Sequence, residues 1–348
     1  MEMKSSLCRG NRLSTALLLA IASMLPQSVS FSQERQKPDE DARAAKQRMK
    51  NFRISGSPEA IAFDGTHIWV ASRSGNSVTK LRAKDGVKLS QFVVGARPTA
   101  LAYDGSNIWV ANSLDDNVMK LRATDGALLG GVKVGNYPSA LLFDGAFIWV
   151  ANSKSNTVTK LRASDMAKLG DFPVGARPMA LAFDGDHIWV SNNDSHNVTK
   201  LRATDGELVG AFAAGNSPIG IAFDGENIWV ANFYSSSVTK LRADDGSIVG
   251  DYAVEDGPAS VIYAKGYIWV ANYGGVSLTK VDPRNGDSHT IALDESPSAV
   301  LCEGDNIWVA SSRGNSVTKI IQMQKPPQGH LANPGARQDA GPELRNGH

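Results

Sequence analysis

The sequence predicts an all-β repeat fold, and three observations support this prediction. Ile-Trp-Val followed by Ala or Ser occurs seven times and contains all seven tryptophans of the 348-residue chain. These tryptophans recur every 40 residues, with a last interval of 39, at Trp69, Trp109, Trp149, Trp189, Trp229, Trp269 and Trp308. Asp, Gly and Pro punctuate each unit about every ten residues, and no segment has the 3.6-residue period of a helical repeat.

Each unit contains four short segments with the pattern of strands. In the segment that follows the proline, small Ala100 and Ala102 alternate with large Leu101 and Tyr103, as in a strand with two different faces. An Asp-Gly turn leads to the Ile-Trp-Val strand, and a polar loop leads to the third strand, Val-Thr-Lys-Leu-Arg. A second Asp-Gly turn precedes the fourth. Four antiparallel strands in about 40 residues, repeated radially, predict a seven-bladed β-propeller.

One turn departs from this pattern. Met166 replaces the glycine of the second Asp-Gly turn in the third unit. Because a side chain disfavours positive φ, we expect this turn to change type or to be strained.

The ends of the repeat array predict how the ring closes. The seventh unit stops after its third strand, and no fourth strand follows it. Residues 51–54 precede Ser57-Pro58 in the way that residues 91–94 precede Arg97-Pro98. We therefore expect the N-terminal strand to complete the last blade, which removes an exposed sheet edge.

The segments outside the repeats predict export. Residues 1–30 have a basic start, a short apolar run and small residues at a cleavage site, which is typical of a signal peptide. Residues 31–49 form a charged linker, residues 50–322 the propeller and residues 323–348 a flexible tail rich in Pro and Gly. We expect a secreted or periplasmic monomer with no transmembrane segment after signal cleavage.

The units resemble YVTN and NHL-type β-propeller repeats. The matching residues are the apolar entry ending in Phe-Asp-Gly, the Ile-Trp-Val-Ala-Asn strand, the Asn-x-Val-Thr-Lys-Leu strand and the Val-Gly-x-x-Pro exit. The units are also similar to the repeats of virginiamycin B (streptogramin) lyase, a metal-dependent enzyme whose second strands tend to end in an acidic residue. Here that position holds Asn112, Asn152, Asn192, Asn232, Asn272, Ser72 and Ser311. The resemblance implies the fold, and we assign no catalytic residue from it.

Composition and spacing argue against several chemical functions. Net charge is +1, and no aromatic residues are interleaved with the repeated Thr-Lys-Leu-Arg, so we expect no nucleic-acid partner. The tryptophan ring is interpreted as packing between blades rather than as a cofactor clamp, and we expect no cofactor. The Asp-Gly spacing matches no EF-hand loop, so no metal ligand is assigned. Cys302, the one cysteine of the mature chain, is expected to be a buried, inert thiol.

Function is therefore sought in positions that differ between units. The fourth-to-first and second-to-third loops share one face, because strands alternate in direction. The candidate binding residues on that face are Arg73, Arg97, Tyr137, Arg177, Asn193, Asp194, His196, Phe233, Tyr234 and Tyr273. Arg with aromatic residues is typical of recognition surfaces. The alternative interpretation of these positions is ordinary loop divergence after duplication.

The leading hypothesis is an exported binding module that recognises a protein, a glycan or a small anionic ligand on this face. The alternative is a metal-dependent lyase or lactonase-like hydrolase with its site at the axial mouth. A third hypothesis is a structural surface protein tethered by its tail.

Overall fold

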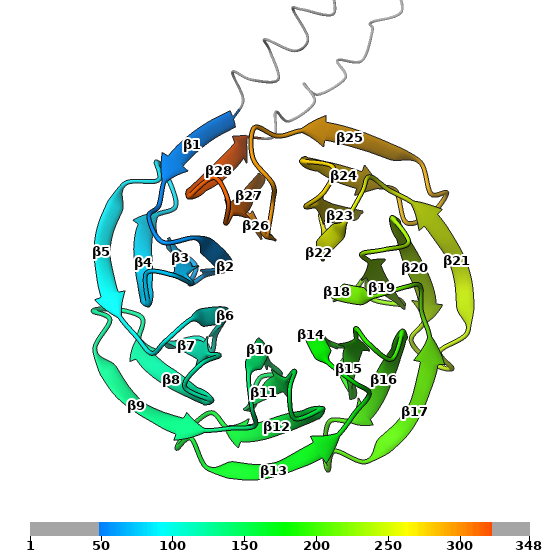
Figure 1. The fold of residues 1–348 in the computed structure, drawn as a ribbon, viewed down its shortest axis with the longest axis horizontal. Coiled ribbons are helices and arrows are strands. Elements are labelled where there is room, and N and C mark those ends of the chain that lie inside the picture. Colours follow the sequence, from blue (N-terminus) through cyan, green and yellow to red (C-terminus); the bar gives the residue numbers. More distant parts are fainter. Residues whose placement is uncertain (1–48, 322–348) are drawn as a thin grey trace, which may run out of the picture. The chain divides into compact units, whose positions relative to one another are not determined.

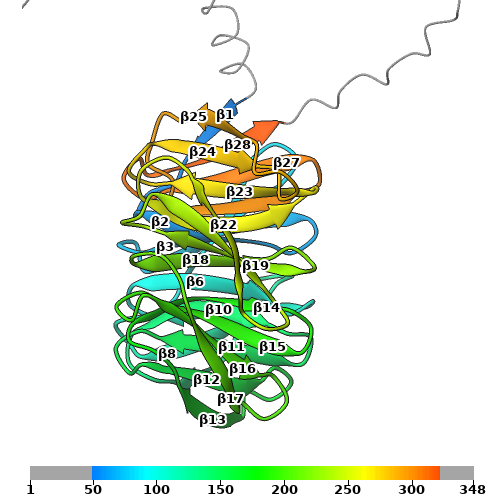
Figure 2. The same ribbon diagram turned by 90° about the vertical axis from the view of Figure 1, so that its right-hand side faces the viewer.

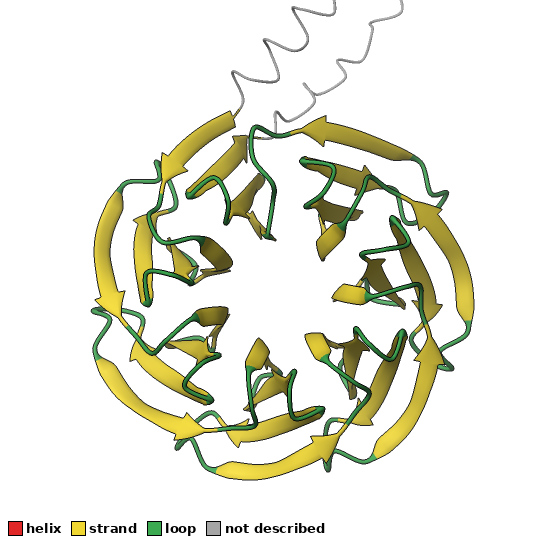
Figure 3. Cartoon of the chain, viewed as in Figure 1, coloured by secondary structure: helices red, strands yellow, loops and turns green. Residues whose placement is uncertain are grey.

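A computed structural model of the protein describes residues 49–321. Across these residues, 28 strands form seven antiparallel sheets of four strands, arranged as blades around a central axis (Figure 1). Only loops and turns connect them (Figure 3). The predicted seven-bladed propeller is confirmed. The predicted signal peptide, the tail and the linker up to residue 48 lie outside the described residues.

The strands occupy four radial positions. The innermost strands are β2 (Pro58–Phe63), β6 (Pro98–Tyr103), β10 (Pro138–Phe143), β14 (Pro178–Phe183), β18 (Pro218–Phe223), β22 (Pro258–Ala264) and β26 (Ala299–Glu303). The second strands are β3 (His67–Ser72), β7 (Asn107–Asn112), β11 (Phe147–Asn152), β15 (His187–Asn192), β19 (Asn227–Asn232), β23 (Tyr267–Asn272) and β27 (Asn306–Ser311).

The outer half of each blade repeats in the same way. The third strands are β4 (Ser77–Arg82), β8 (Asn117–Arg122), β12 (Thr157–Arg162), β16 (Asn197–Arg202), β20 (Ser237–Arg242), β24 (Ser277–Val281) and β28 (Ser316–Ile321). The outermost strands are β5 (Lys88–Val93), β9 (Leu128–Lys133), β13 (Lys168–Pro173), β17 (Leu208–Ala213), β21 (Ile248–Ala253), β25 (Ser288–Ala292) and β1 (Met49–Arg53). Blade 1 is β2–β5, and blades 2 to 6 follow in chain order.

Blade 7 combines both ends of the described chain. Strand β1 pairs with β28 in antiparallel register, with Phe52 opposite Val317, and so completes the sheet of β26, β27 and β28. Figure 2 shows β1 and β28 together in a side view of the ring. The predicted closure is confirmed. Residues 49–321 contain no helix with the length and hydropathy needed to cross a membrane.

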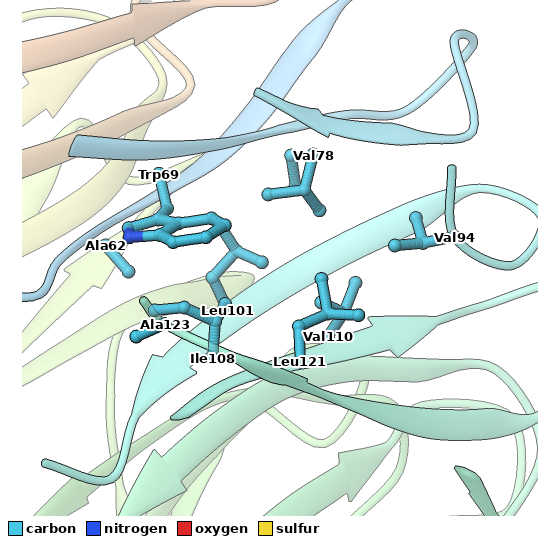
Figure 4. Close-up of a cluster of buried hydrophobic side chains, with 10 residues drawn as sticks. Ala62, Trp69, Val78, Val94, Leu101, Ile108, Val110, Leu121 and Ala123 are labelled. Atoms are coloured by element: carbon cyan, nitrogen blue, oxygen red, sulfur yellow. The ribbon is translucent and has the colours of Figure 1, made fainter. Parts of the chain in front are cut away.

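The tryptophans fill the space between adjacent blades, as predicted. All seven are at most 2% exposed. Trp69 of blade 1 belongs to the same buried cluster as Leu101, Ile108 and Leu121 of blade 2 (Figure 4). A single blade leaves this apolar face uncovered, and the neighbouring blade buries it.

A polar network joins each tryptophan to its surroundings. The indole N–H of Trp69 donates to Asp64 in the first turn of its blade at 2.8 Å, and the Lys80 ammonium lies 5.0 Å from the ring centroid. Lys80 then donates to the carbonyl of Ala123 in the next blade at 2.7 Å. The equivalent lysines of five other blades donate to the next blade in the same way, so these lysines link neighbouring blades. The Asp of the first turn accepts the indole N–H as well as forming the hairpin turn. In blade 6, Ala264 occupies the Asp position, and Trp269 Nε1 has no partner within residues 49–321.

The Met166 turn keeps its type. Met166 has a φ of 63°, and its N–H bonds to the Arg162 carbonyl at 2.9 Å, as the glycines of this turn do in other blades. In the equivalent turn of blade 2, a Cβ on Gly126 would lie 2.0 Å from the Phe92 ring. Blade 2 has Val132 where blade 1 has Phe92, and Val132 packs in the same cluster as Met166. The smaller Val132 therefore leaves room for the Met166 side chain. The turn is still strained, because a non-glycine residue has to adopt a left-handed backbone conformation there.

The structure corrects one core assignment. Cys302 is half-buried rather than fully buried, and its thiol lies 3.5 Å from the Gly304 carbonyl oxygen. Burial raises the pKa of Cys302, an effect that Lys265 partly opposes. A raised pKa leaves less reactive thiolate at neutral pH, in keeping with an inert thiol.

We predict that Trp189→Ala lowers the free energy of unfolding by about 3–5 kcal/mol, because truncating a buried aromatic side chain opens a cavity between two blades. Urea unfolding followed by circular dichroism measures this loss. Tyr234→Ala serves as the control, since Tyr234 is 73% exposed and surface substitutions usually change stability by about 0.5 kcal/mol or less. A loss below about 1 kcal/mol for Trp189→Ala would contradict the packing role.

We also predict that Gly126→Ala is more destabilising than Gly105→Ala, although both glycines have positive φ, 75° and 95°. A methyl group at Gly105 meets nothing within 4 Å, whereas at Gly126 it collides with Phe92. We expect a loss of about 1–2 kcal/mol for the first variant from backbone strain alone, and about 1–3 kcal/mol more for the second. Equal losses in thermal unfolding would show that the Phe92 contact does not constrain the turn.

Candidate functional site

One face of the ring carries the loops that vary most between blades. We call it the loop face; it holds the connections from second to third strands and those from each outermost strand to the next innermost strand. The opposite face holds the Asp-Gly turns, where regular pairs such as Arg122–Asp125, at 3.1 Å, recur from blade to blade. The loop face is therefore where one blade can differ from the next.

The residue before the innermost proline is held in a defined conformation on this face. Arg97, Tyr137 and Arg177 all lie in the left-handed region, with φ of 57°, 58° and 56°. Their backbone N–H groups bond to side chains of the preceding blade, for example Arg97 N to Asn76 Oδ1 at 2.9 Å. A non-glycine in this region costs about 1–2 kcal/mol, so the surrounding loops fix the backbone from which these side chains project.

Five residues of blades 1 to 3 form a group that we call the Arg97 cluster. It comprises Glu59 on β2, Arg73 after β3, Arg97 before β6, Tyr137 before β10 and Lys154 after β11. The Arg97 guanidinium lies 5.3 Å and the Lys154 ammonium 4.7 Å from the Tyr137 ring centroid. Arg73 lies 3.7 Å from the Glu59 carboxylate, which is beyond hydrogen-bond distance. The structure thus brings together three of the predicted residues.

The cluster has more positive than negative charge. It holds three cationic side chains and one carboxylate; Arg73 and Arg97 act on Glu59, and Lys154 lies against Tyr137. Arg97 Nε is buried without a hydrogen-bond partner among the described residues. Burial raises the pKa of Glu59, while Arg73 and Arg97 oppose this effect. A buried unpaired donor is unfavourable, so the cluster can accept a further anionic group.

Arg177 and its neighbours lie apart from this cluster. The Arg177 guanidinium pairs with Asp194 at 3.4 Å, and both side chains are more than half exposed. Asn193 is 5% exposed, and its amide bonds to Ser217 Oγ at 2.6 Å, so it supports the loop from within. His196 Nδ1 accepts the N–H of Ser217 at 3.1 Å, which places the proton of the neutral ring on Nε2.

The remaining candidates form an aromatic group on blades 5 and 6. The rings of Phe233 and Tyr234 are edge to face, with centroids 5.2 Å apart. Tyr273 is covered by the Arg313 guanidinium of blade 7, at 4.8 Å. These aromatic side chains pair with each other or with Arg313, and no contact joins them to the Arg97 cluster within the described part of the chain.

Across residues 49–321, no three His, Cys, Asp or Glu side chains lie close enough together to hold an ion. The asparagines at the ends of the second strands are fully buried, and Asn152 Nδ2 bonds to Thr159 Oγ1 at 2.8 Å. The position that tends to be acidic in the lyase repeats is therefore an internal structural position in this chain.

Sequence reasoning missed two members of the Arg97 cluster. Glu59 carried a usable signal, because it is the one charged residue among the seven that follow the innermost prolines. Lys154 follows the second strand of its unit by two residues, like many loop residues, and nothing in the sequence shows that its ammonium reaches Tyr137.

No protein-family model and no curated protein sequence matches this chain. Among solved structures, the chain is similar to a catalytically inactive variant of virginiamycin B lyase from Staphylococcus aureus with quinupristin, with a TM-score of 0.70 and 14% identity over 79% of this chain and 99% of that one. A streptogramin B lyase matches with a TM-score of 0.68 and 17% identity, covering 78% of this chain and 96% of that one.

Hydrazine synthase from Kuenenia stuttgartiensis also matches, with a TM-score of 0.68 and 18% identity, covering 78% of this chain and 97% of that one. At such identities the similarity establishes the fold alone, since one fold serves unrelated chemistries. The lyase structures agree with the distant relation that the repeat sequences indicated.

Proposed function

We propose that the protein is an exported binding module whose loop face recognises an anionic group of a small ligand, a glycan or an acidic protein. The Arg97 cluster is the observation that carries this proposal: Arg73 and Arg97 act on one carboxylate, Lys154 adds a third cation beside Tyr137, and Arg97 Nε is left unpaired. Planar guanidinium groups suit carboxylate, phosphate and sulfate, and a tyrosine ring adds a flat contact surface.

The arrangement around Tyr137 supports an anionic ligand in particular. Both Arg97 and Lys154 lie over this ring, at 5.3 and 4.7 Å from its centroid. Each cation offers an anionic group a charge-assisted hydrogen bond beside the same ring. Because Tyr137 is fixed by its backbone bond to Asp116 at 2.8 Å, the site is largely organised before a ligand arrives.

Export is the second part of the proposal and rests on the sequence of residues 1–30, with its basic start, short apolar run and small residues near Ser30. A secreted or periplasmic protein meets acidic glycans and anionic metabolites in the surrounding medium. The loop face would bind them through Arg73 and Arg97.

An enzymatic function is the second candidate, favoured by the fold similarity to two streptogramin lyases. A lyase or lactonase-like hydrolase would use the axial mouth, where Glu59 lies on the innermost strand β2. Incubation of the protein with quinupristin or a lactone and a divalent cation, followed by mass spectrometry, tests this candidate. Turnover that Glu59→Gln abolishes would replace the binding proposal.

We predict that Arg73→Ala/Arg97→Ala lowers the affinity for an anionic ligand at least about tenfold, because each guanidinium supplies a charge-assisted hydrogen bond. A screen of sulfated and carboxylated glycans and acidic peptides identifies the ligand, and isothermal titration calorimetry measures its affinity. Affinity for the wild type is expected to fall as salt rises, since exposed charges are screened.

The matched control is Arg162→Ala/Arg202→Ala, which removes the same charge from the opposite face, where both side chains pair with nearby acids. The variant Arg97→Ala/Arg177→Ala separates the cluster from the exposed Arg177–Asp194 pair. Binding that survives both loop-face variants and high salt would contradict the proposal and direct attention to Phe233, Tyr234 and Tyr273.

A further inference from the structure

The position of Glu59 differs from its equivalents in the other blades. The residues that follow the other innermost prolines are Thr99, Ser139, Met179, Ile219, Ala259 and Ser298. The three with a hydroxyl group donate it to the proline carbonyl of the next blade: Thr99 to Pro138 at 2.8 Å, Ser139 to Pro178 at 2.8 Å and Ser298 to Pro58 at 3.0 Å. Glu59 makes no such bond.

A carboxylate cannot fill this donor role. It accepts hydrogen bonds only, whereas a protonated carboxyl group has one O–H donor. The equivalent acceptor for Glu59 is the carbonyl of Pro98, the next innermost proline. Protonation therefore gives Glu59 the same kind of donor that Thr99, Ser139 and Ser298 have, and it removes the carboxylate charge from a half-buried position.

Glu59 is also placed so that its charge responds to a ligand. Arg73 lies 3.7 Å away without a hydrogen bond, and Arg97 acts on the carboxylate as well. Of the other ionisable groups on the strands packed against β2, Glu303 on β26, His67 on β3 and Tyr103 on β6 lie at the strand ends away from Glu59. Asp115 in the neighbouring loop is engaged by the Ala96 N–H at 2.6 Å. Arg73 and Arg97 are thus the charges that favour ionised Glu59.

We propose that Glu59 is a built-in counter-ion of the Arg97 cluster, and that a ligand anion replaces it there while Glu59 takes up a proton from solvent. This inference rests on the proposed binding function and specifies how that site is regulated. In the overall reaction the protein binds one anion at the arginines and one proton at Glu59. A neutral Glu59 then turns from the arginines to the Pro98 carbonyl.

The sign of the pH dependence follows from this exchange. Burial raises the pKa of Glu59 in the free protein, and an anion on Arg73 and Arg97 cancels their opposing effect and adds repulsion. The pKa of Glu59 therefore rises further when the anion binds. By linkage, anion affinity increases as pH falls between the bound and free pKa values, and it is constant outside that window.

The test uses methanesulfonate and sulfate, whose charges stay the same over the pH range of the experiment. We predict that the affinity of wild-type protein, titrated by calorimetry from about pH 8 to about pH 5, rises by at most about tenfold per pH unit, as one coupled proton requires. Titrations in two buffers with different ionisation enthalpies measure the proton taken up. We expect net uptake in the wild type within the sloping part of the profile.

Two substitutions isolate Glu59. Glu59→Gln removes the charge. Glu59→Ser places at this position the residue type that Ser139 and Ser298 have in other blades. Because serine is already accepted at this position of the fold, at least one of the two variants is expected to fold. Both variants should bind the anions more tightly than the wild type at about pH 8, without a pH slope and without proton uptake. The control is Glu255→Gln, an exposed carboxylate elsewhere on the loop face, which should keep the wild-type slope.

The outcomes separate this inference from the binding function. A flat profile in the wild type, or a slope that persists in both Glu59 variants, overturns the proton coupling while binding itself stands. If neither the wild type nor the Glu59 variants bind either anion or a ligand from the screen, the binding function is overturned and the coupling with it.

Discussion

The structure depends on one contact that repeats around the ring, the burial of a tryptophan against the next blade. A blade of four strands has an apolar face that it cannot cover alone, so stability comes from the interfaces between neighbours. In six of the seven described blades an acid of the same blade accepts the indole N–H, as Asp64 does from Trp69. Lys80 extends this network to a carbonyl of the following blade. Each blade needs the following blade to cover its apolar face, so the last blade has to meet the first. The pairing of β1 with β28 completes the last blade and closes the ring.

This arrangement explains why the two faces of the ring differ. The buried network uses the strands and the Asp-Gly turns, and those positions hardly vary. On the loop face, the backbone before five of the seven innermost prolines is held by a side chain of the preceding loop, as Arg97 N is held by Asn76 Oδ1. The backbone conformation does not depend on the side chain at that position, so Arg, Tyr and Ser all occur there in the same left-handed conformation. The fold thus supplies fixed attachment points whose chemistry can change.

The sequence predicted the parts of the structure that repetition makes visible. Trp spacing, strand alternation and the match of residues 51–54 to residues 91–94 were enough for the fold and its closure. Properties that arise between blades were not visible. The buried Lys80 looks like a surface residue in sequence, Asn193 looks like a loop residue although it is buried, and half-buried Cys302 sits where other blades have a large ring. In the candidate site, the contact between Arg97 and Tyr137 could be predicted, because their loops are adjacent. The contact between Lys154 and Tyr137 could not, because it depends on the conformation of the lysine side chain.

Glu59 shows how a symmetric scaffold can acquire a single site. The hydroxyl tie made by Thr99 and its equivalents is not required at every interface, because Met179 and Ala259 occupy the same position without it. Replacing that tie therefore leaves the ring intact, and a carboxylate there is not explained by the needs of the scaffold. Burying a charge is unfavourable unless it is paired, and here the pairing comes from Arg73 and Arg97 in two neighbouring loops. Each of these three charged side chains is favourable in its position only because the other two are present. Such mutual dependence is expected of a binding site rather than of three independent substitutions.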